Sequence, residues 1–140
     1  MTALATRFGS VEELLADARS RLVRVSPVQA AAQVAAGARI VDIRPAWQRE
    51  AGGEVPGALV VERNHLEWRL HPDSPARVAE AVPGQRWLVL CDEGYTSSLA
   101  ADALRSIGVP ATDIVDGFQA WRAAGLPVVS TLTSPNTFVH

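Results

Sequence analysis

The 140-residue sequence contains no lysine: all thirteen of its basic residues are arginines. Without lysine the chain cannot form a Schiff base with a carbonyl substrate, and it cannot hold a phosphate with a lysine ammonium group. Fifteen acidic residues bring the net charge to −2 and the pI to about 5.9. This balance lacks the strong positive field that binds nucleic acids and anionic membranes, so neither is expected as a partner.

Cysteine and histidine are also scarce. The single cysteine, Cys91, cannot form an intramolecular disulfide, so a reducing cytoplasm fits better than secretion. His65, His71 and His140 lack the spacing of metal ligands, and we predict neither a metal nor any other cofactor. The N-terminus lacks the order of a signal peptide, and no apolar run approaches the roughly 18–20 residues of a membrane span. The sequence therefore predicts a soluble, cytoplasmic protein.

Short apolar runs alternate with helical patterns along the chain. Strands are predicted at residues 23–25, 39–43, 58–61, 87–90 and 111–115, and helices at 10–22, 26–37, 64–70, 76–82, 97–107 and 117–124, with a loop at 51–57. Ser10 before Glu13 and Asn64 before Glu67 have the spacing of helix N-caps. Most of the strands are continuously apolar, which is typical of a parallel sheet with helices on both faces.

The length and the 48% hydrophobic content allow one hydrophobic core. We therefore predict a single α/β domain at residues 23–129. Residues 1–22 are expected to form an amphipathic helix that packs on this domain, and residues 130–140 a polar, loose tail.

The stretch from Trp87 to Gly108 is the most informative part of the sequence. A buried strand at 87–90 leads into the loop Cys91–Thr96 and then into a helix. Such a turn aims backbone N–H groups at one point on the positive end of the helix, which favours a thiolate at Cys91. Gly94 can adopt a left-handed backbone, and hydroxyls of Thr96 and Ser97 can cap the helix or donate to the sulfur.

Four motifs make the sequence resemble the single-domain rhodaneses of the sulfurtransferase superfamily. They are Val41-Asp42-Ile43-Arg44, Val55-Pro56-Gly57-Ala58, the Cys91–Thr96 loop, and Gly117-Phe118-Gln119-Ala120-Trp121 followed by Gly125-Leu126-Pro127-Val128. The resemblance implies a three-layer α/β fold with a five-stranded, mainly parallel sheet. It also implies that Cys91 takes a sulfane sulfur from a small-molecule or protein-bound donor, becomes a persulfide, and passes the sulfur to cyanide or a thiol.

The loop departs from the family pattern in its charge. Family members that use thiosulfate commonly carry basic residues where this sequence has Asp92 and Glu93. Two carboxylates repel a dianionic donor, and each costs a nearby thiolate about 1 kcal/mol at 4 Å in water. The helix end offers a comparable 0.3–1 kcal/mol in the other direction. We therefore predict a sulfurtransferase that is not specialised for thiosulfate.

The remaining charged residues receive less specific interpretations. Asp42 and Arg44 are expected to be structural residues that hold the strand end and the neighbouring loop by hydrogen bonds or an ion pair, and Tyr95 projects from the loop, where it can contact the substrate. Arg49 and Arg63 are candidate pocket residues, and with Arg69 they could return positive charge to the loop.

Two other functions stay open at this stage. A phosphatase of the same fold needs one more loop residue and an arginine where this chain has Ser97 and Ser98. A non-enzymatic domain for protein interaction or sulfur sensing would keep the loop without turnover. The sequence also leaves a homodimer open.

Overall fold

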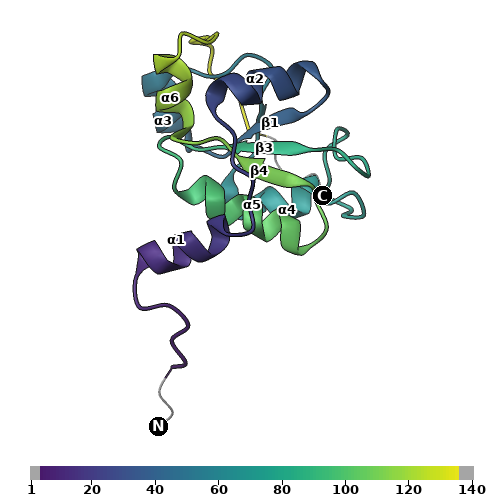
Figure 1. Cartoon of the computed structure of the whole chain (residues 1–140). Coiled ribbons are helices and arrows are strands. Elements are labelled where there is room, and N and C mark those ends of the chain that lie inside the picture. Colours follow the sequence, from purple (N-terminus) through teal and green to yellow (C-terminus); the bar gives the residue numbers. More distant parts are fainter. Residues whose placement is uncertain (1–3, 136–140) are drawn as a thin grey trace.

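A parallel sheet lies at the centre of the computed structural model, which describes residues 4–135 (Figure 1). Its strands are β1 (Arg39–Asp42), β2 (Leu59–Val60), β3 (Trp87–Leu90) and β4 (Ala111–Asp113). They lie in the order β2-β1-β3-β4, and every neighbouring pair is parallel. The carboxyl ends of all four strands therefore meet at one edge of the sheet, where sites form in folds of this kind.

The sheet has four strands among the described residues, not the predicted five. Residues 23–25, expected as a strand, contribute only a parallel bridge between Val25 and Ile114. Val25 donates its N–H to the Asp113 carbonyl and accepts from the Val115 N–H. Pairing stops there because Ser26 is already the N-cap of the next helix, and Pro27 has no N–H to donate.

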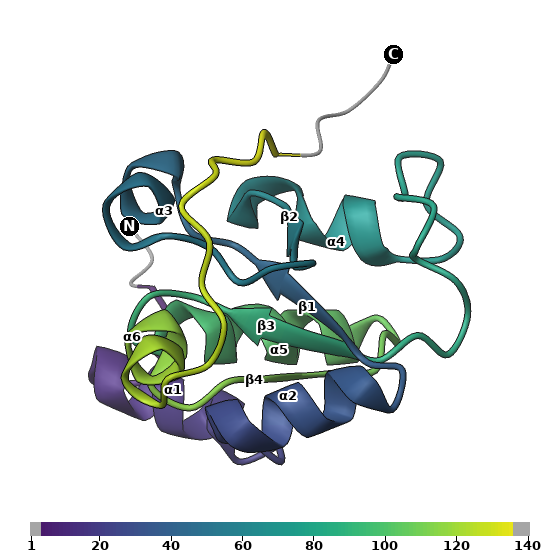
Figure 2. The ribbon, with the colours of Figure 1, turned by 90° about the horizontal axis from the view of Figure 1, so that it is seen from above.

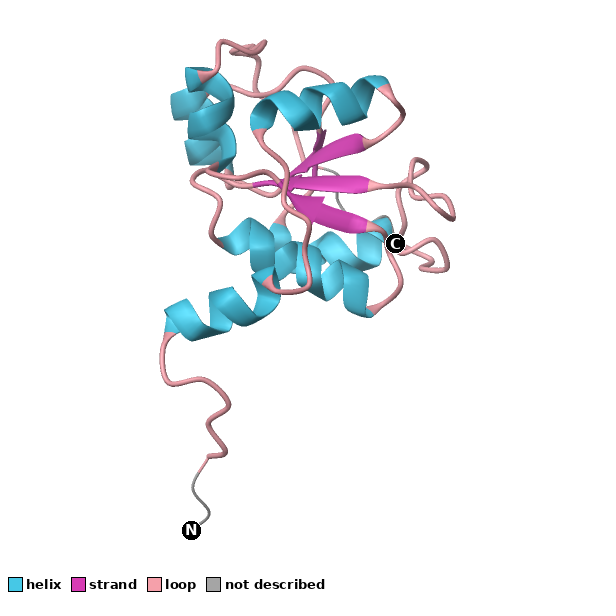
Figure 3. Ribbon diagram, viewed as in Figure 1, coloured by secondary structure: helices cyan, strands magenta, loops and turns pink. Residues whose placement is uncertain are grey.

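Helices cover both faces of the sheet, as expected for a three-layer α/β fold. In residues 4–135 they are α1 (Val11–Arg19), α2 (Pro27–Ala35), α3 (Ala46–Gly52), α4 (Leu66–Leu70), α5 (Thr96–Ser106), α6 (Gly117–Ala123) and the 3-10 turn η1 (Arg63–His65). Figures 2 and 3 show α2 and α6 on one side of the strands and α4 and α5 on the other. Helix α1 packs on α5 at the outer side of this second layer. No described helix is long and apolar enough to cross a membrane.

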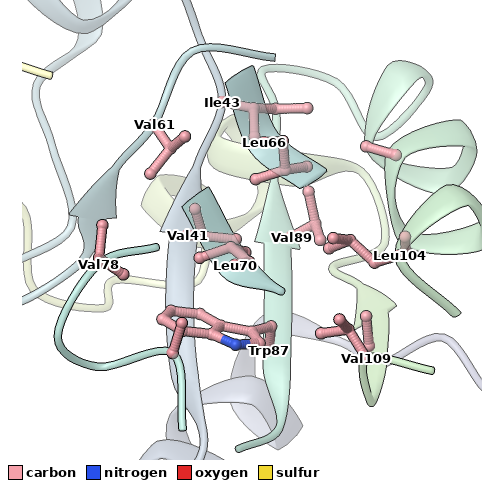
Figure 4. Close-up of a cluster of buried hydrophobic side chains, with 14 of the residues drawn as sticks. Val41, Ile43, Val61, Leu66, Leu70, Val78, Trp87, Val89, Leu104 and Val109 are labelled. Carbon is pink, nitrogen blue, oxygen red and sulfur yellow. The ribbon is translucent and has the colours of Figure 1, made fainter. Parts of the chain in front are cut away.

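Successive side chains of a strand point to opposite faces of the sheet, so the strands contribute to two hydrophobic cores. Under α4 and α5, Leu66, Leu70 and Leu104 pack with Val41 and Val89 of the two central strands (Figure 4). Residues one step along the same strands point to the opposite face, where they pack under α2 and α6: Ile40, Leu88 and Leu90, with Ala30, Phe118 and Trp121. Burial on both faces explains the apolar residues at consecutive positions of the two central strands, Ile40 and Val41 in β1 and Trp87–Leu90 in β3.

Three local predictions need correction. Residues 76–82, expected as a helix, form turns, because prolines at 72, 75 and 83 leave too short a segment for a stable helix. Asn64 does not cap α4, since it lies inside η1 and His65 occupies the N-cap position. The predicted loop at 51–57 begins inside a helix, because α3 continues to Gly52.

The chain beyond Val129 is not loose where the structure describes it. Val129 forms an antiparallel bridge with Glu54. The Thr133 N–H donates to Glu54 at 3.1 Å, and its carbonyl accepts from Arg49 at 2.5 Å. Residues 136–140 of the predicted tail, and residues 1–3 of the predicted N-terminal part, lie outside the described residues.

This attachment predicts a pH-dependent stability. Burial opposes the ionisation of Glu54, but hydrogen bonds from Thr133 and Arg49 outweigh it and hold the pKa of the carboxyl below its ordinary value of 4.5. The contribution of Glu54 to the free energy of unfolding is therefore present above pH 4.5 and is lost as the pH falls through the lowered pKa. Glu54→Gln should lower the melting temperature by roughly 5 °C at pH 7, and the difference from the wild type should shrink between pH 5 and 3. A difference in melting temperature between the two proteins that stays equal from pH 7 to pH 3 would contradict this prediction.

Candidate active site

Cys91 directly follows β3, at the point where the loop Cys91–Thr96 turns into α5. Its Sγ accepts hydrogen bonds from the N–H of Gly94 at 3.2 Å and of Ser97 at 3.4 Å. The side chain is only 4% exposed, yet it lines a pocket of about 320 Å³. Cys91 thus combines backbone donors to its sulfur with a place in the lining of a pocket, and a loop nucleophile needs both.

Two chain segments line this pocket, the Cys91 loop and the segment that follows β1. The lining residues are Ile43, Arg44, Pro45, Gln48, Cys91, Asp92, Glu93, Tyr95 and Thr96. The pocket therefore presents two carboxylates and one guanidinium. Tyr95 is 61% exposed and stands at the mouth, where it can contact a bound molecule. Of the loop residues predicted from the sequence, Gly94 and Ser97 do not line the pocket but contact the sulfur through their N–H groups.

Asp42 and Arg44 form a buried ion pair below the pocket. Arg44 Nη2 donates to Asp42 Oδ2 at 2.8 Å and to the Gly53 carbonyl at 2.8 Å. Arg44 Nη1 has no hydrogen-bond partner in the described part of the chain, and the guanidinium lies 4.0 Å from the centre of the Phe118 ring. Nη1 is 3.9 Å from Asp92 Oδ1. The pair links the end of β1 to the Gly53 carbonyl, and Arg44 also brings positive charge to the pocket wall.

Asp113 is a buried carboxylate that the sequence reading missed. It lies at the end of β4 and accepts from the hydroxyls of Ser97 and Ser98, at 2.7 and 2.8 Å. Arg24 compensates its charge, with Nε 2.9 Å from Oδ1. The Ser97 hydroxyl thus fixes the first turn of α5 and does not face the sulfur. A signal was present in the sequence, because a charge within an apolar strand must find a partner when it is buried.

The three arginines that were expected to return charge to the loop lie elsewhere. Arg49 on α3 donates to Glu54 at 2.6 Å, Arg63 pairs with Glu67 at 2.8 Å, and Arg69 donates to the Ala76 carbonyl at 2.7 Å. None of them lines the pocket. For Arg49 the reason is helix α3, which turns its side chain toward the buried Glu54.

The start of α6 holds the loop from below. The N–H of Phe118 donates to the Cys91 carbonyl at 2.9 Å, and the N–H of Gln119 donates to the Asp92 carbonyl at 3.1 Å. Gly117 has φ +58, and a Cβ there would lie 2.4 Å from the Cys91 carbonyl oxygen. Only glycine allows the helix to approach this closely. The Gln119 side chain also donates to Asp92 Oδ1 at 3.0 Å.

The fold and this loop define a three-layer α/β protein with a cysteine at the carboxyl end of a central parallel strand. The chain matches the Rhodanese-like domain family over residues 26–124 and belongs to that family. No curated protein matches its sequence.

Solved structures share the fold of this chain. A protein of unknown function from Rhodopseudomonas palustris, described as a possible tyrosine phosphatase, is 31% identical with a TM-score of 0.78, over 91% of this chain and 98% of that one. A rhodanese-related protein from Thermoplasma volcanium is 20% identical with a TM-score of 0.62, over 77% and 98%. A thiosulfate sulfurtransferase from Pseudomonas aeruginosa is 23% identical with a TM-score of 0.60, over 80% of this chain and 20% of that one. The last two likenesses concern the fold alone.

Proposed function

We propose that the protein is a sulfurtransferase that carries sulfur as a persulfide on Cys91. The observation that carries this proposal is the setting of Cys91, whose Sγ accepts from the Gly94 and Ser97 N–H groups and which lines a pocket of about 320 Å³. Fixed N–H donors stabilise an anion without having to reorganise during the reaction. These donors stabilise the Cys91 thiolate that attacks the sulfur donor and that is restored at the end of the cycle.

The reaction proceeds in two displacements. In the first, the Cys91 thiolate attacks the outer sulfur of a donor R–S–S⁻, a new S–S bond forms at Sγ, and R–S⁻ leaves with the electron pair of the broken bond. In the second, cyanide or an acceptor thiolate attacks the outer sulfur of the persulfide. Thiocyanate or the acceptor persulfide then departs, and the thiolate is restored. Because the chain has one cysteine, the acceptor must come from outside the protein.

The pocket charge favours donors other than thiosulfate. Asp92 and Glu93 place two carboxylates at the pocket, and the Arg44 guanidinium faces one of them at 3.9 Å. A dianionic donor meets repulsion from both carboxylates, whereas a neutral, cationic or protein-bound donor does not. Thiosulfate should therefore be a poor substrate beside a low-molecular-weight persulfide whose organic part is neutral or cationic, because that donor carries less negative charge.

Asp92→Asn should raise kcat/KM for thiosulfate about tenfold, because it removes one negative charge beside the bound thiosulfate. The asparagine keeps an oxygen that accepts the hydrogen bond from Gln119. Rates with an uncharged donor should change little. Asp73→Asn is the matched control, since it removes an exposed carboxylate that does not line the pocket. Equal gains from both variants, or no gain from Asp92→Asn, would refute the electrostatic explanation.

The test of the proposed function is a turnover assay over a panel of donors. The protein is incubated with thiosulfate, polysulfide or a low-molecular-weight persulfide, cyanide is added, and thiocyanate is measured over time. Catalytic thiocyanate formation with at least one donor supports the proposal. Persulfide formation without turnover supports a sulfur-sensing or interaction domain, and no reaction with any donor refutes the sulfurtransferase.

A phosphatase is the second candidate, favoured by the description of the Rhodopseudomonas palustris protein as a possible tyrosine phosphatase. Phosphate requires a bidentate cation, and the start of α5 offers Thr96, Ser97 and Ser98 in that place. Asp92 and Glu93 also oppose a phosphate dianion. Phosphate release from an aryl phosphate, lost in Cys91→Ser, would establish this activity instead.

A further inference from the structure

Two arginines from the start of the chain converge on one carbonyl of the Cys91 loop. Arg19, the last residue of α1, donates from Nη2 to the Gly94 carbonyl at 2.7 Å. Arg24 donates from Nη2 to the same oxygen at 3.0 Å. Both residues precede residue 26, where the match to the family begins. Neither lines the pocket, so they reach the loop from its outer side.

The position of this carbonyl determines where the neighbouring N–H groups point. The described chain has no cis peptide bond, so the Gly94 carbonyl and the Tyr95 N–H point in opposite directions. The arginines hold the Gly94 carbonyl on the side of the loop away from the pocket. The Tyr95 N–H therefore points to the other side of the loop, where Sγ lies. The N–H groups of Gly94 and Ser97 already face Sγ there. The arginines therefore fix the orientation of the peptide group that lies between these two donors.

Both arginines are themselves held, Arg19 by Ser98 in the first turn of α5 and Arg24 by Asp113 at the end of β4. Arg24 makes a two-point contact with Asp113, whose Oδ2 also accepts from Ser97 and Ser98. Arg19 donates from Nε to the Ser98 hydroxyl at 3.0 Å and forms no ion pair with the described residues. The charge of Arg24 is thus balanced by Asp113, whereas that of Arg19 is not balanced by a carboxylate.

We propose that Arg19 and Arg24 are positioning residues of the Cys91 loop. They hold the Gly94 carbonyl away from the sulfur and keep the N–H groups of the loop turned toward Sγ, and Arg19, whose charge no carboxylate balances, adds positive charge to the loop. The role of these arginines in sulfur transfer rests on the proposed function. It makes the segment from α1 to Arg24 a part of the reactive unit and not only a support for α5.

The experiment compares Arg19→Gln with Arg21→Gln. Arg21 is the matched control, because it also joins α1 to α5, through Asp17 and Asp102, but does not touch the loop. With a saturating low-molecular-weight persulfide, Arg19→Gln should load sulfur about tenfold more slowly while the donor KM stays within twofold. Arg19→Lys should recover most of the rate, since it restores the charge and one donor. Arg21→Gln should load sulfur at the wild-type rate.

Arg24 is tested together with its buried partner. Arg24→Gln leaves Asp113 uncompensated and can prevent folding, so the double variant Arg24→Gln with Asp113→Asn is measured beside it. A folded double variant should load sulfur more slowly than the wild type by a similar factor. Wild-type loading by folded Arg19→Gln and by the double variant would overturn the inference.

A second reaction separates the inference from the proposed function. Iodoacetamide alkylates Cys91 as the only cysteine of the chain, and this reaction needs the thiolate but no sulfur donor. Arg19→Gln should react several-fold more slowly than Arg21→Gln. If the wild type carries no sulfur, the proposed function fails, and a slower alkylation of Arg19→Gln still supports the positioning role. Equal alkylation rates for the two variants would refute that role.

Discussion

Cys91→Ser should abolish sulfur transfer, with a loss of at least about 1000-fold in thiocyanate formation. A serine hydroxyl in this place keeps the size and the backbone donors of the site but cannot hold a sulfane sulfur. The change is small enough to leave the buried core around residue 91 intact, so the melting temperature should stay near that of the wild type. Thiocyanate formation with a low-molecular-weight persulfide and cyanide, after subtraction of the rate without protein, is measured beside a thermal melt.

The sequence makes this result decisive. The chain has no second cysteine to which the sulfur could move. Transfer that persists in a folded Cys91→Ser protein would show that the donor and acceptor react without a cysteine carrier, and the proposed mechanism would be wrong. Loss of transfer with an unchanged melt would assign the chemistry to the thiol itself.

Gly94→Ala should lower sulfur transfer by about 100-fold or more, because small displacements of a reacting group have effects of this size. Gly94 has φ +86, and a Cβ there would lie 2.7 Å from the Asp116 nitrogen and 3.0 Å from its Cα. These are backbone atoms at the start of α6, so they cannot turn aside as a side chain would. The loop must move, and with it the N–H group that faces Sγ.

Gly108→Ala is the matched control for this variant. Gly108 follows α5, has φ +84, and has open space where a Cβ would be placed. Both substitutions carry a similar backbone penalty of about 1–2 kcal/mol, but only the change at residue 94 meets a neighbour. Gly108→Ala should therefore lose stability and keep its transfer rate. Similar transfer rates for the two variants would show that loop geometry does not limit the reaction.

The sequence predicted the parts of the molecule that depend on local pattern. The apolar run of β3, with Ile40 and Val41 of β1, indicated a parallel sheet covered on both faces, and the structure confirms it. The resemblance carried by residues 41–44, 55–58, 91–96 and 117–128 is confirmed by the family match. The position of Cys91 after a buried strand follows from the same local rules, because the strand, the loop and the helix are contiguous in sequence.

Contacts between distant residues were not accessible in this way. Arg19 and Gly94 are 75 residues apart, and Arg24 and Asp113 are 89 residues apart. No periodicity of a single chain encodes which arginine reaches which carbonyl. The choice of Arg49 as a pocket residue failed for a related reason. The direction of the Arg49 side chain is set by helix α3, whose last residues were expected as loop, and by its hydrogen bond to Glu54.

The residues that hold the Cys91 loop extend beyond the region that matches the family. The match begins at residue 26, but the Gly94 carbonyl is held by residues 19 and 24. A protein shortened to the matched residues would keep the sheet strands and the cysteine and would lose both guanidinium contacts to the loop. The N-terminal segment should therefore be retained in any variant of this protein that is assayed for sulfur transfer.

The intact mass of the protein before and after sulfur loading tests the central claim most directly. After incubation with polysulfide or a low-molecular-weight persulfide, the wild type should gain about 32 Da, one sulfur atom on Cys91. Cyanide or a thiol should then return the mass to its starting value. No gain with any donor, or a gain that neither acceptor removes, would contradict the claim that this loop holds a transferable sulfur.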